Sequence, residues 1–241
     1  MVTLYQFPPA YGLSSVSPFC TKVELFLRLA GIPHEVKSGD VRQSPTGKLP
    51  TARVGGELVA DSGMIIEACK ARLDVDMDGG LDPKQRALGH LMRRTCEENL
   101  YWVLVYSRWL DEEGWKHQRP VLVGMLPPVI GPLLTGYLRS GARKSMHGHG
   151  LARHKQETVY QIGLADLESL VVLLPDEGFV FGAEPSTTDA VVGAFLWHIL
   201  ATPTDNALSR AARASGPAVA YMRRVLERAG WTEQAAALPL D

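Results

Sequence analysis

Apolar and polar residues alternate in two different ways along the chain, which divides it into two parts. In the first part, β-branched and aromatic residues at positions 2–7 predict a buried strand. Ser17-Pro18 then predicts the start of a helix, because serine is a favoured N-cap and proline suits the first helical turn. The apolar stripe of this helix runs to residue 30, and Gly31 followed by Pro33 ends it.

Three further strands are predicted in this part, at 34–37, Thr51–Val54 and Glu57–Ala60. Gly55-Gly56 predicts a hairpin between the last two, because both glycines tolerate positive φ. A strand, a helix and another strand in this order favour a right-handed parallel crossover. With a second helix over about 64–73, we predict an α/β domain over residues 1–77 that contains a small mixed sheet.

The rest of the chain has a helical pattern with no strand alternation. After a polar linker at 74–82, helices are predicted over 83–109, about 153–174, 186–200 and about 217–229. Ser186 and Asp189 have the spacing of a capping box and precede an almost entirely apolar helix, which predicts that this helix is buried. We therefore expect an all-α C-terminal domain over residues 83–241.

The composition excludes several classes of function. The chain of 241 residues has 25 Lys and Arg against 26 Asp and Glu, so a net charge of −1 gives no electrostatic reason to expect nucleic acid as a partner. Its cysteines, Cys20, Cys69 and Cys96, are odd in number and unpaired in spacing. This pattern argues against a disulfide scaffold and a metal site, and favours a reducing compartment. Since the N-terminus lacks the pattern of a signal peptide, we expect a cytoplasmic protein.

Residues 120–138 contain no charged side chain and are long enough to cross a bilayer. However, the segment contains Pro120, Pro127, Pro128 and Pro132, and proline removes backbone hydrogen bonds that lipid cannot replace. We interpret it as two short packed helices or a helix–loop–helix tip, and the prolines argue against contact with a membrane.

The first candidate for chemistry is Ser17-Pro18-Phe19-Cys20, at the predicted helix start. Unpaired N–H groups and roughly half a positive charge at a helix N-terminus stabilise a thiolate. The Ser17 hydroxyl could donate to the thiolate of a bound substrate, or Cys20 could itself be the nucleophile. The alternative without catalysis is that Ser17 caps the helix and Cys20 fills the core.

Two further motifs follow in order along the chain. A cis bond between Leu49 and Pro50 would turn the backbone N–H and C=O of Leu49 outward, where they could pair with a peptide-like ligand. At Asp61-Ser62, the helix N–H groups and the Ser62 hydroxyl could bind a carboxylate while Asp61 binds an ammonium group. An ordinary strand-edge proline and an ordinary helix cap are the alternatives.

Taken in this order, the three motifs resemble the thioredoxin-like domain of glutathione transferases, and the capped apolar helix resembles the core of their second domain. The resemblance implies that Ser17 activates the thiol of glutathione, with Cys20 and Tyr11 as alternatives. It also implies that Leu49-Pro50 holds the cysteinyl backbone and that Asp61-Ser62 holds the γ-glutamyl end. In the same family, the helix carrying Tyr101 and Trp102 overhangs the thiol, so these residues and Tyr11 would line an apolar co-substrate pocket unless they simply pack in the core.

Segments 17–24, 97–102 and 149–154 look like the branch of this superfamily named for metaxins and failed-axon-connections proteins. The resemblance implies a homodimer that conjugates glutathione to an apolar electrophile, without a metal. Two other uses of the fold stay open. One is a Cys20-based glutathione-dependent thiol transferase or reductase, and the other is a non-catalytic, metaxin-like interaction protein.

Overall fold

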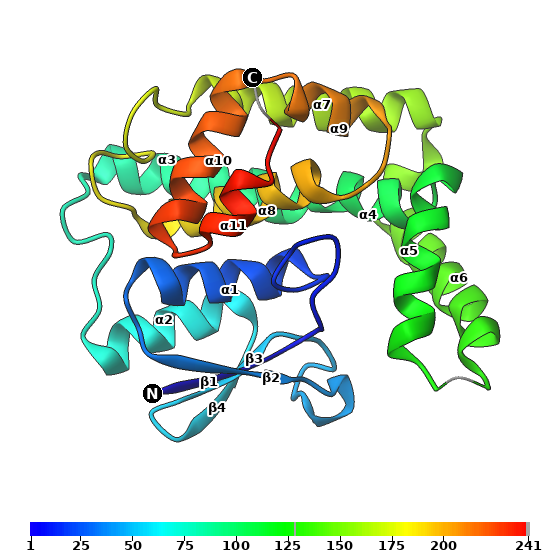
Figure 1. Cartoon of the computed structure of the whole chain (residues 1–241), viewed down its shortest axis with the longest axis horizontal. Coiled ribbons are helices and arrows are strands. Elements are labelled where there is room, and N and C mark those ends of the chain that lie inside the picture. Colours follow the sequence, from blue (N-terminus) through cyan, green and yellow to red (C-terminus); the bar gives the residue numbers. More distant parts are fainter. Residues whose placement is uncertain (128, 240–241) are drawn as a thin grey trace.

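The computed structural model describes residues 1–127 and 129–239, and it has the predicted architecture of a thioredoxin-like α/β domain followed by a helical domain (Figure 1). The first domain contains β1 (Val2–Gln6), α1 (Pro18–Leu29), β2 (His34–Ser38), β3 (Thr51–Val54), β4 (Glu57–Ala60) and α2 (Ser62–Leu73), with a 3-10 turn at Val41–Gln43. The second contains α3 (Pro83–Arg94), a π-helical segment η2 (Thr95–Leu100), α4 (Tyr101–Trp109), α5 (Glu112–Met125), α6 (Gly131–His149), a 3-10 turn at Leu151–Arg153, α7 (Gln156–Val172), α8 (Thr187–Ala201), α9 (Ala207–Arg213), α10 (Gly216–Arg228) and α11 (Thr232–Ala236).

The strands form one mixed sheet in the order β2-β1-β3-β4. β1 and β2 are parallel, as the crossover through α1 predicts, and β3 is antiparallel to both β1 and β4. Tyr5 pairs with Thr51, and Thr51 pairs with Ala60. This register brings the end of β1, the start of β3 and the end of β4 to the same edge of the sheet.

Helix α8 is the centre of the molecule, and it packs along α1 between the two domains. Every residue from Thr188 to Leu200 is buried, as its almost continuous apolar sequence predicts. The predicted capping box is confirmed: the Asp189 carboxylate accepts bonds from the Ser186 N–H and hydroxyl, both at 2.8 Å. The same carboxylate accepts from the Val180 N–H at 2.9 Å and the Tyr221 hydroxyl at 2.8 Å, so it ties α10 and the loop before α8 to the helix start.

Helices α5 and α6 form a hairpin that projects from the helical domain and runs down beside the α/β domain (Figure 1). This confirms the predicted helix–loop–helix tip, although both helices are longer than expected. Pro120 lies inside α5, and Pro128 lies outside the described residues. No helix within the described residues is long and apolar enough to span a membrane.

Two further details differ from the sequence prediction. The expected single helix over 83–109 is interrupted by η2, in which the wider π-helical turn changes the direction of the side chains relative to a regular α-helix. The short helices α9 and α11 were not predicted, because each is too short to show a helical repeat.

Candidate functional site

The sequence motifs converge at the sheet edge defined by the end of β1, the start of β3 and the end of β4. Ser17 begins the helix that follows β1, Pro50 directly precedes β3, and Asp61 directly follows β4. Adjacent strands lie roughly 4.8 Å apart, so these three positions form one arc along the edge.

Ser17 occupies the N-cap position of α1, but its side chain makes no capping hydrogen bond. Its carbonyl accepts from the Thr21 N–H at 3.0 Å, and its own N–H donates to the Ser15 hydroxyl at 3.3 Å. Pro18 begins the helix, as predicted. Because the Ser17 hydroxyl is not used as a cap, it can donate to a ligand placed at the helix N-terminus.

Cys20 lies in the first turn of α1 and has an exposed fraction of 0%. Burial raises the pKa of its thiol to about 11, although hydrogen bonding with the side chains of Ser17 and Ser15 and with the backbone of Phe7 opposes the shift. The thiol is therefore neutral near pH 7 and closed to solvent, which is the environment of a core cysteine rather than of a nucleophile.

The peptide bond between Leu49 and Pro50 is cis. The Leu49 side chain is buried, and among the described residues no hydrogen bond uses the Leu49 backbone N–H or C=O. These two groups are therefore free to pair with an extended ligand that lies along the edge of the sheet.

Asp61 is the N-cap of α2 and has φ of 76°, a left-handed conformation that is uncommon outside glycine. Its Oδ1 accepts from the N–H groups of Gly63 at 2.8 Å and Met64 at 3.2 Å. Ser62, the first residue of α2, is 4% exposed. The helix start thus combines N–H groups, a hydroxyl and an exposed carboxylate, a set of groups that suits an amino-acid ligand.

Charged residues from the helical domain approach this corner, and no local sequence pattern predicts this approach. Lys22 of α1 is 1% exposed and forms a 2.5 Å ion pair with Glu97 of η2. Burial lowers the pKa of Lys22, whereas Glu97 and Asp61 oppose that shift. An Arg93 nitrogen lies 3.7 Å from the position that a Cβ on Gly63 would occupy, and Oδ1 of Asp61 lies 3.3 Å from the same position. Contacts between residues so far apart in sequence depend on how the two domains pack.

A buried guanidinium lies directly behind the start of α1. Arg108 of α4 donates to the Val16 carbonyl at 3.1 Å, to His198 Nδ1 at 3.0 Å and to Thr202 Oγ1 at 2.5 Å. Burial lowers the pKa of Arg108 to about 10, so it remains a cation at neutral pH, and no carboxylate within the described residues contacts it. It therefore adds positive potential next to Ser17.

The same contacts fix the protonation of His198. Arg108 can only donate, so Nδ1 of His198 must accept. Burial and the neighbouring cation hold the pKa of His198 well below its ordinary value of 6.5, so the ring is neutral with its proton on Nε2. Nε2 then donates to Thr21 Oγ1 at 2.9 Å. Val16 and Thr21 lie on either side of Ser17, and both are held by the helical domain.

Aromatic side chains gather beside the start of α1. Phe19 packs against Tyr101 at 4.8 Å between ring centroids, Tyr101 against Trp102 at 5.3 Å, and Trp102 stacks on His149 at 4.7 Å. Burial raises the pKa of Tyr101, so its hydroxyl stays protonated, and no hydrogen bond within the described residues uses it. These residues can form one side of an apolar pocket that contains a free hydroxyl donor.

Tyr11 approaches the site from the long loop after β1, in a left-handed conformation with φ of 58°. Its hydroxyl donates toward the His117 carbonyl at 3.1 Å and Gln118 Oε1 at 3.2 Å, both on α5. Burial raises the pKa of Tyr11, opposed by the Arg108 cation. Tyr11 therefore connects the loop to the α5–α6 hairpin, and using its hydroxyl on a thiol would require breaking these contacts.

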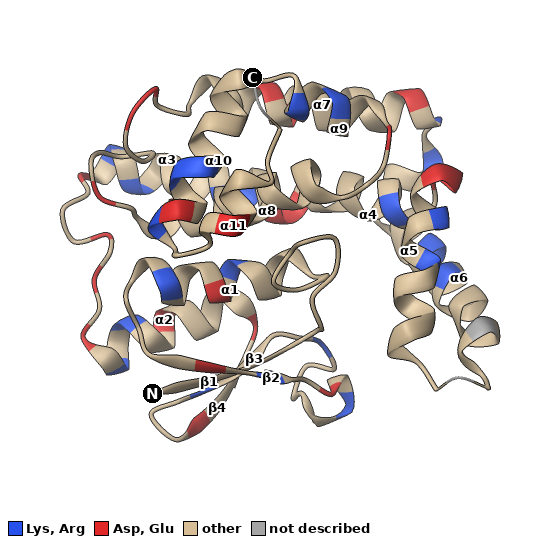
Figure 2. Cartoon of the chain, viewed as in Figure 1, with Lys and Arg blue, Asp and Glu red and all other residues tan. Residues whose placement is uncertain are grey.

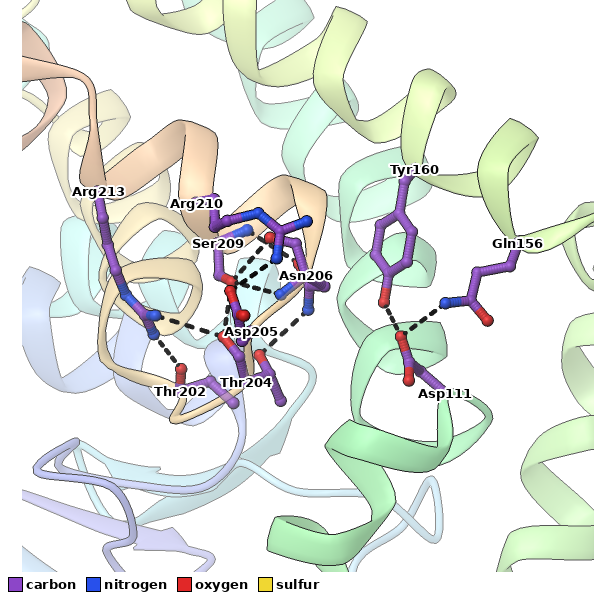
Figure 3. A network of polar contacts seen from close by, with 10 residues as sticks. All are labelled: Asp111, Gln156, Tyr160, Thr202, Thr204, Asp205, Asn206, Ser209, Arg210 and Arg213. Atoms are coloured by element: carbon purple, nitrogen blue, oxygen red, sulfur yellow. Dashed lines mark hydrogen bonds and ion pairs between the residues drawn. The ribbon is translucent and has the colours of Figure 1, made fainter.

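Two hollows lie outside this arc. One of about 280 Å³ lies between α2, α3 and the start of α8, and Arg93 lines its edge. The other, of about 350 Å³, lies between α7, α9 and the start of α5. Its wall includes Asp111, which accepts from the Tyr160 hydroxyl at 2.5 Å and from Gln156 at 3.2 Å (Figure 3). No group of three or more potential metal ligands occurs within the described residues.

A thioredoxin-like domain joined to a helical domain is the architecture of the class of glutathione transferases. Here a serine at a helix start, a cis-proline and an Asp-Ser pair lie on one edge of the sheet. Residues 18–114 match the family described as the glutathione S-transferase N-terminal domain. The chain is 33% identical over 211 residues to isoprene-epoxide–glutathione S-transferase of Rhodococcus sp. (strain AD45), covering 84% of this chain and 88% of that protein. The chain therefore belongs to the glutathione S-transferase family.

The narrower resemblance is confirmed as well. Failed axon connections of Drosophila melanogaster is 31% identical over 206 residues, covering 81% of this chain and 49% of that protein. Metaxin-2 of Homo sapiens is 24% identical over 207 residues, covering 84% of this chain and 78% of that protein. Among solved structures, a glutathione S-transferase of Methylobacillus flagellatus KT with glutathione bound has a TM-score of 0.60 at 14% identity, covering 100% of both chains, and shows the same fold.

Proposed function

We propose that the chain binds glutathione along the edge formed by Ser17, Leu49-Pro50 and Asp61-Ser62, and conjugates the glutathione thiolate to an apolar electrophile. The observation that carries this proposal is that Ser17 occupies the N-cap position of α1 while its hydroxyl makes no capping hydrogen bond. The free backbone groups of Leu49 suit the cysteinyl peptide, and the start of α2 suits the γ-glutamyl carboxylate and ammonium.

In this mechanism, Ser17, the N–H groups of α1 and the positive potential of Arg108 stabilise the glutathione thiolate. The name of the Rhodococcus relative makes an epoxide the first electrophile to test. The sulfur would attack an epoxide carbon while the carbon–oxygen bond breaks, and the resulting alkoxide would take a proton from solvent. Tyr101 would donate a hydrogen bond to that oxygen, which lowers the energy of the developing charge.

The test combines calorimetric titration of glutathione with an assay of epoxide conjugation. We expect saturable binding by the wild-type chain and weaker binding by Asp61→Asn, because that variant removes the charge that faces the ammonium group. Asp176→Asn, an exposed aspartate in the loop between α7 and α8, is the matched control and should bind as the wild type does. Absence of glutathione binding by the wild-type chain would refute the proposal.

A second candidate is a non-catalytic interaction protein, which the similarity to Failed axon connections and Metaxin-2 supports. The same titration separates the two functions, because this alternative requires neither glutathione binding nor turnover. By contrast, the burial of Cys20 argues against the thiol-transferase alternative.

We further infer a cytoplasmic homodimer formed through α2 and α3. Met64 on α2 is 60% exposed and Leu91 on α3 is 62% exposed, and a second copy would remove both from water. Light scattering after size exclusion tests this inference. We expect the wild-type chain to have twice the mass of one chain and Leu91→Glu to shift toward the monomer, whereas a monomeric wild type would refute it.

A further inference from the structure

The α5–α6 hairpin differs in charge from the rest of the protein. Residues 112–149, which form the hairpin, contain five lysines and arginines (Lys116, Arg119, Arg139, Arg143 and Lys144) and two acidic residues, Glu112 and Glu113, in the first turn of α5. The whole chain has a net charge of −1. Figure 2 shows the hairpin with basic residues on the half nearest the helical domain and an uncharged free end. This concentration of one sign of charge favours an anionic partner.

The free end of the hairpin is also apolar and open to solvent. Val129 is 89% exposed, Leu133 is 79% exposed and Tyr137 is 76% exposed. Ile130 and Leu138, on the same end, are 47% and 37% exposed. Together these five residues form what we call the apolar tip. Large apolar side chains exposed side by side on a projecting element are typical of a binding surface rather than of a surface that stays in water.

Three basic side chains are set back from the apolar tip and are available to bind. Arg119 on α5 and Arg143 and Lys144 on α6 are exposed, and no ion pair within the described residues uses them. At 1.5 Å per residue, Arg143 lies about 15 Å along α6 from Leu133, and Arg119 lies about 10 Å along α5 from the end of that helix. The three cations therefore lie on the hairpin above the tip.

We propose that the hairpin docks onto an anionic lipid surface. The apolar tip enters the boundary between head groups and acyl chains, and Arg119, Arg143 and Lys144 contact lipid phosphates and carboxylates. Interfacial elements insert roughly 5–10 Å, so cations about 10–15 Å behind the tip reach the level of the head groups. A nucleic acid or an acidic protein would explain the charge but not the exposed apolar tip, whereas an anionic bilayer explains both.

This proposal revises the expectation from the sequence that the prolines argue against contact with a membrane. That reasoning applies to a helix that spans the bilayer, where every backbone N–H needs a partner. A hairpin tip at the interface remains in reach of water, so Pro127 in the connecting turn has no such cost. The proposal is also independent of glutathione binding, because the tip contributes no residue to the site described above.

The experiment measures partition of the full chain onto vesicles by co-sedimentation. Vesicles of phosphatidylcholine alone are compared with vesicles that also contain phosphatidylserine. We expect binding to the anionic vesicles that weakens as salt is raised, and little binding to the neutral ones. Arg119→Gln/Arg143→Gln/Lys144→Gln should lower the partition coefficient about 100-fold, since each basic residue near the surface contributes roughly a factor of five.

A second variant tests the apolar tip. Val129→Ser/Leu133→Ser should lower partition onto anionic vesicles at least about tenfold, because two large side chains no longer leave water. Val172→Ser/Leu173→Ser, at an exposed helix end elsewhere, is the matched apolar control, and Lys37→Gln/Lys84→Gln/Arg228→Gln is the matched charge control. Both controls should partition as the wild type does. Circular dichroism melting confirms that each variant is folded.

Four results would overturn the proposal. These are equal binding to neutral and anionic vesicles, no vesicle binding at all, a tip variant that partitions like the wild type, or charge controls that weaken binding as much as the hairpin variant does. Binding to RNA or to an acidic protein without binding to vesicles would also overturn it. The hairpin variants should bind glutathione with the same affinity as the wild type. The vesicle experiment therefore tests the hairpin whether or not the chain is a transferase.

Discussion

Removal of the Ser17 hydroxyl is the most direct test of the proposed activation of the glutathione thiol. In Ser17→Ala, the start of α1 keeps its N–H groups and Pro18, because the serine side chain makes no cap that the helix could lose. The variant therefore removes one charge-assisted hydrogen bond to the thiolate, worth roughly 1.5–3 kcal/mol. At about 1.36 kcal/mol per pKa unit, the pKa of the bound thiol should rise by about 1–2 units.

The assay is the pH dependence of conjugation together with the ultraviolet absorbance of the bound thiolate. Near neutral pH the rate should fall about 10- to 100-fold, and the difference from the wild type should shrink as the pH rises and the thiol ionises in both proteins. Ser169→Ala, which changes a surface serine on α7, should leave the profile unchanged. A Ser17→Ala profile that superimposes on the wild type would refute the role of Ser17, and a shift caused by Tyr11→Phe would assign that role to Tyr11.

Three other predictions follow from buried groups. The Cys20 thiol is closed to solvent and has a pKa of about 11, so iodoacetamide at neutral pH should alkylate it slowly. For the same reason, mass spectra after treatment with oxidised glutathione should show no adduct on Cys20. Rapid labelling would reopen the thiol-transferase alternative. Asp189→Ala leaves the donors of Ser186, Val180 and Tyr221 without their acceptor, so the free energy of unfolding measured in urea should fall by about 3–5 kcal/mol. A decrease below about 1 kcal/mol would contradict the importance of this cap. The pKa of His198 is lowered in the folded state, so below pH 6.5, its ordinary pKa, the unfolded chain binds a proton that the folded chain does not. The free energy of unfolding should therefore fall by up to about 1.4 kcal/mol per pH unit as the pH is lowered. His198→Gln should remove this part of the slope between about pH 7.5 and 5 in urea titrations, and an unchanged slope would show that the ring is protonated when folded.

The α/β domain could be predicted closely because its signals are local. Gly55-Gly56 specifies the turn between β3 and β4, whose bounds match the prediction residue by residue. Ser17-Pro18 specifies the start of α1 in the same way. Each of these signals depends on the φ preferences or hydrogen-bonding groups of two or three neighbouring residues, so they act whatever the rest of the chain does.

The features that the sequence did not reveal depend on long-range packing. No local pattern distinguishes the π-helical segment Thr95–Leu100 from the α-helices on either side, although it is the segment that brings Glu97 to Lys22. Similarly, Arg108 and His198 look like ordinary members of their helices until α4 and α8 meet behind α1. Pro120 breaks a helix in most contexts, yet α5 continues through it.

The Arg108–His198 network also bears on how much of the candidate site belongs to the α/β domain alone. Val16 and Thr21, on either side of Ser17, bond to side chains of the helical domain in addition to their bonds within the α/β domain. The cation that raises the local potential is Arg108 of α4. By donating to Nδ1 of His198, Arg108 also fixes the tautomer in which Nε2 donates to Thr21. If the α/β domain were separated from the helices, it would keep the sheet and the arc of Ser17, Pro50 and Asp61. It would nevertheless lose the positive charge of Arg108 and the two contacts that Arg108 and His198 make with Val16 and Thr21, because both side chains come from the second domain. The electrostatic environment at the start of α1 is therefore a product of the interface between the domains, whichever function the chain performs there.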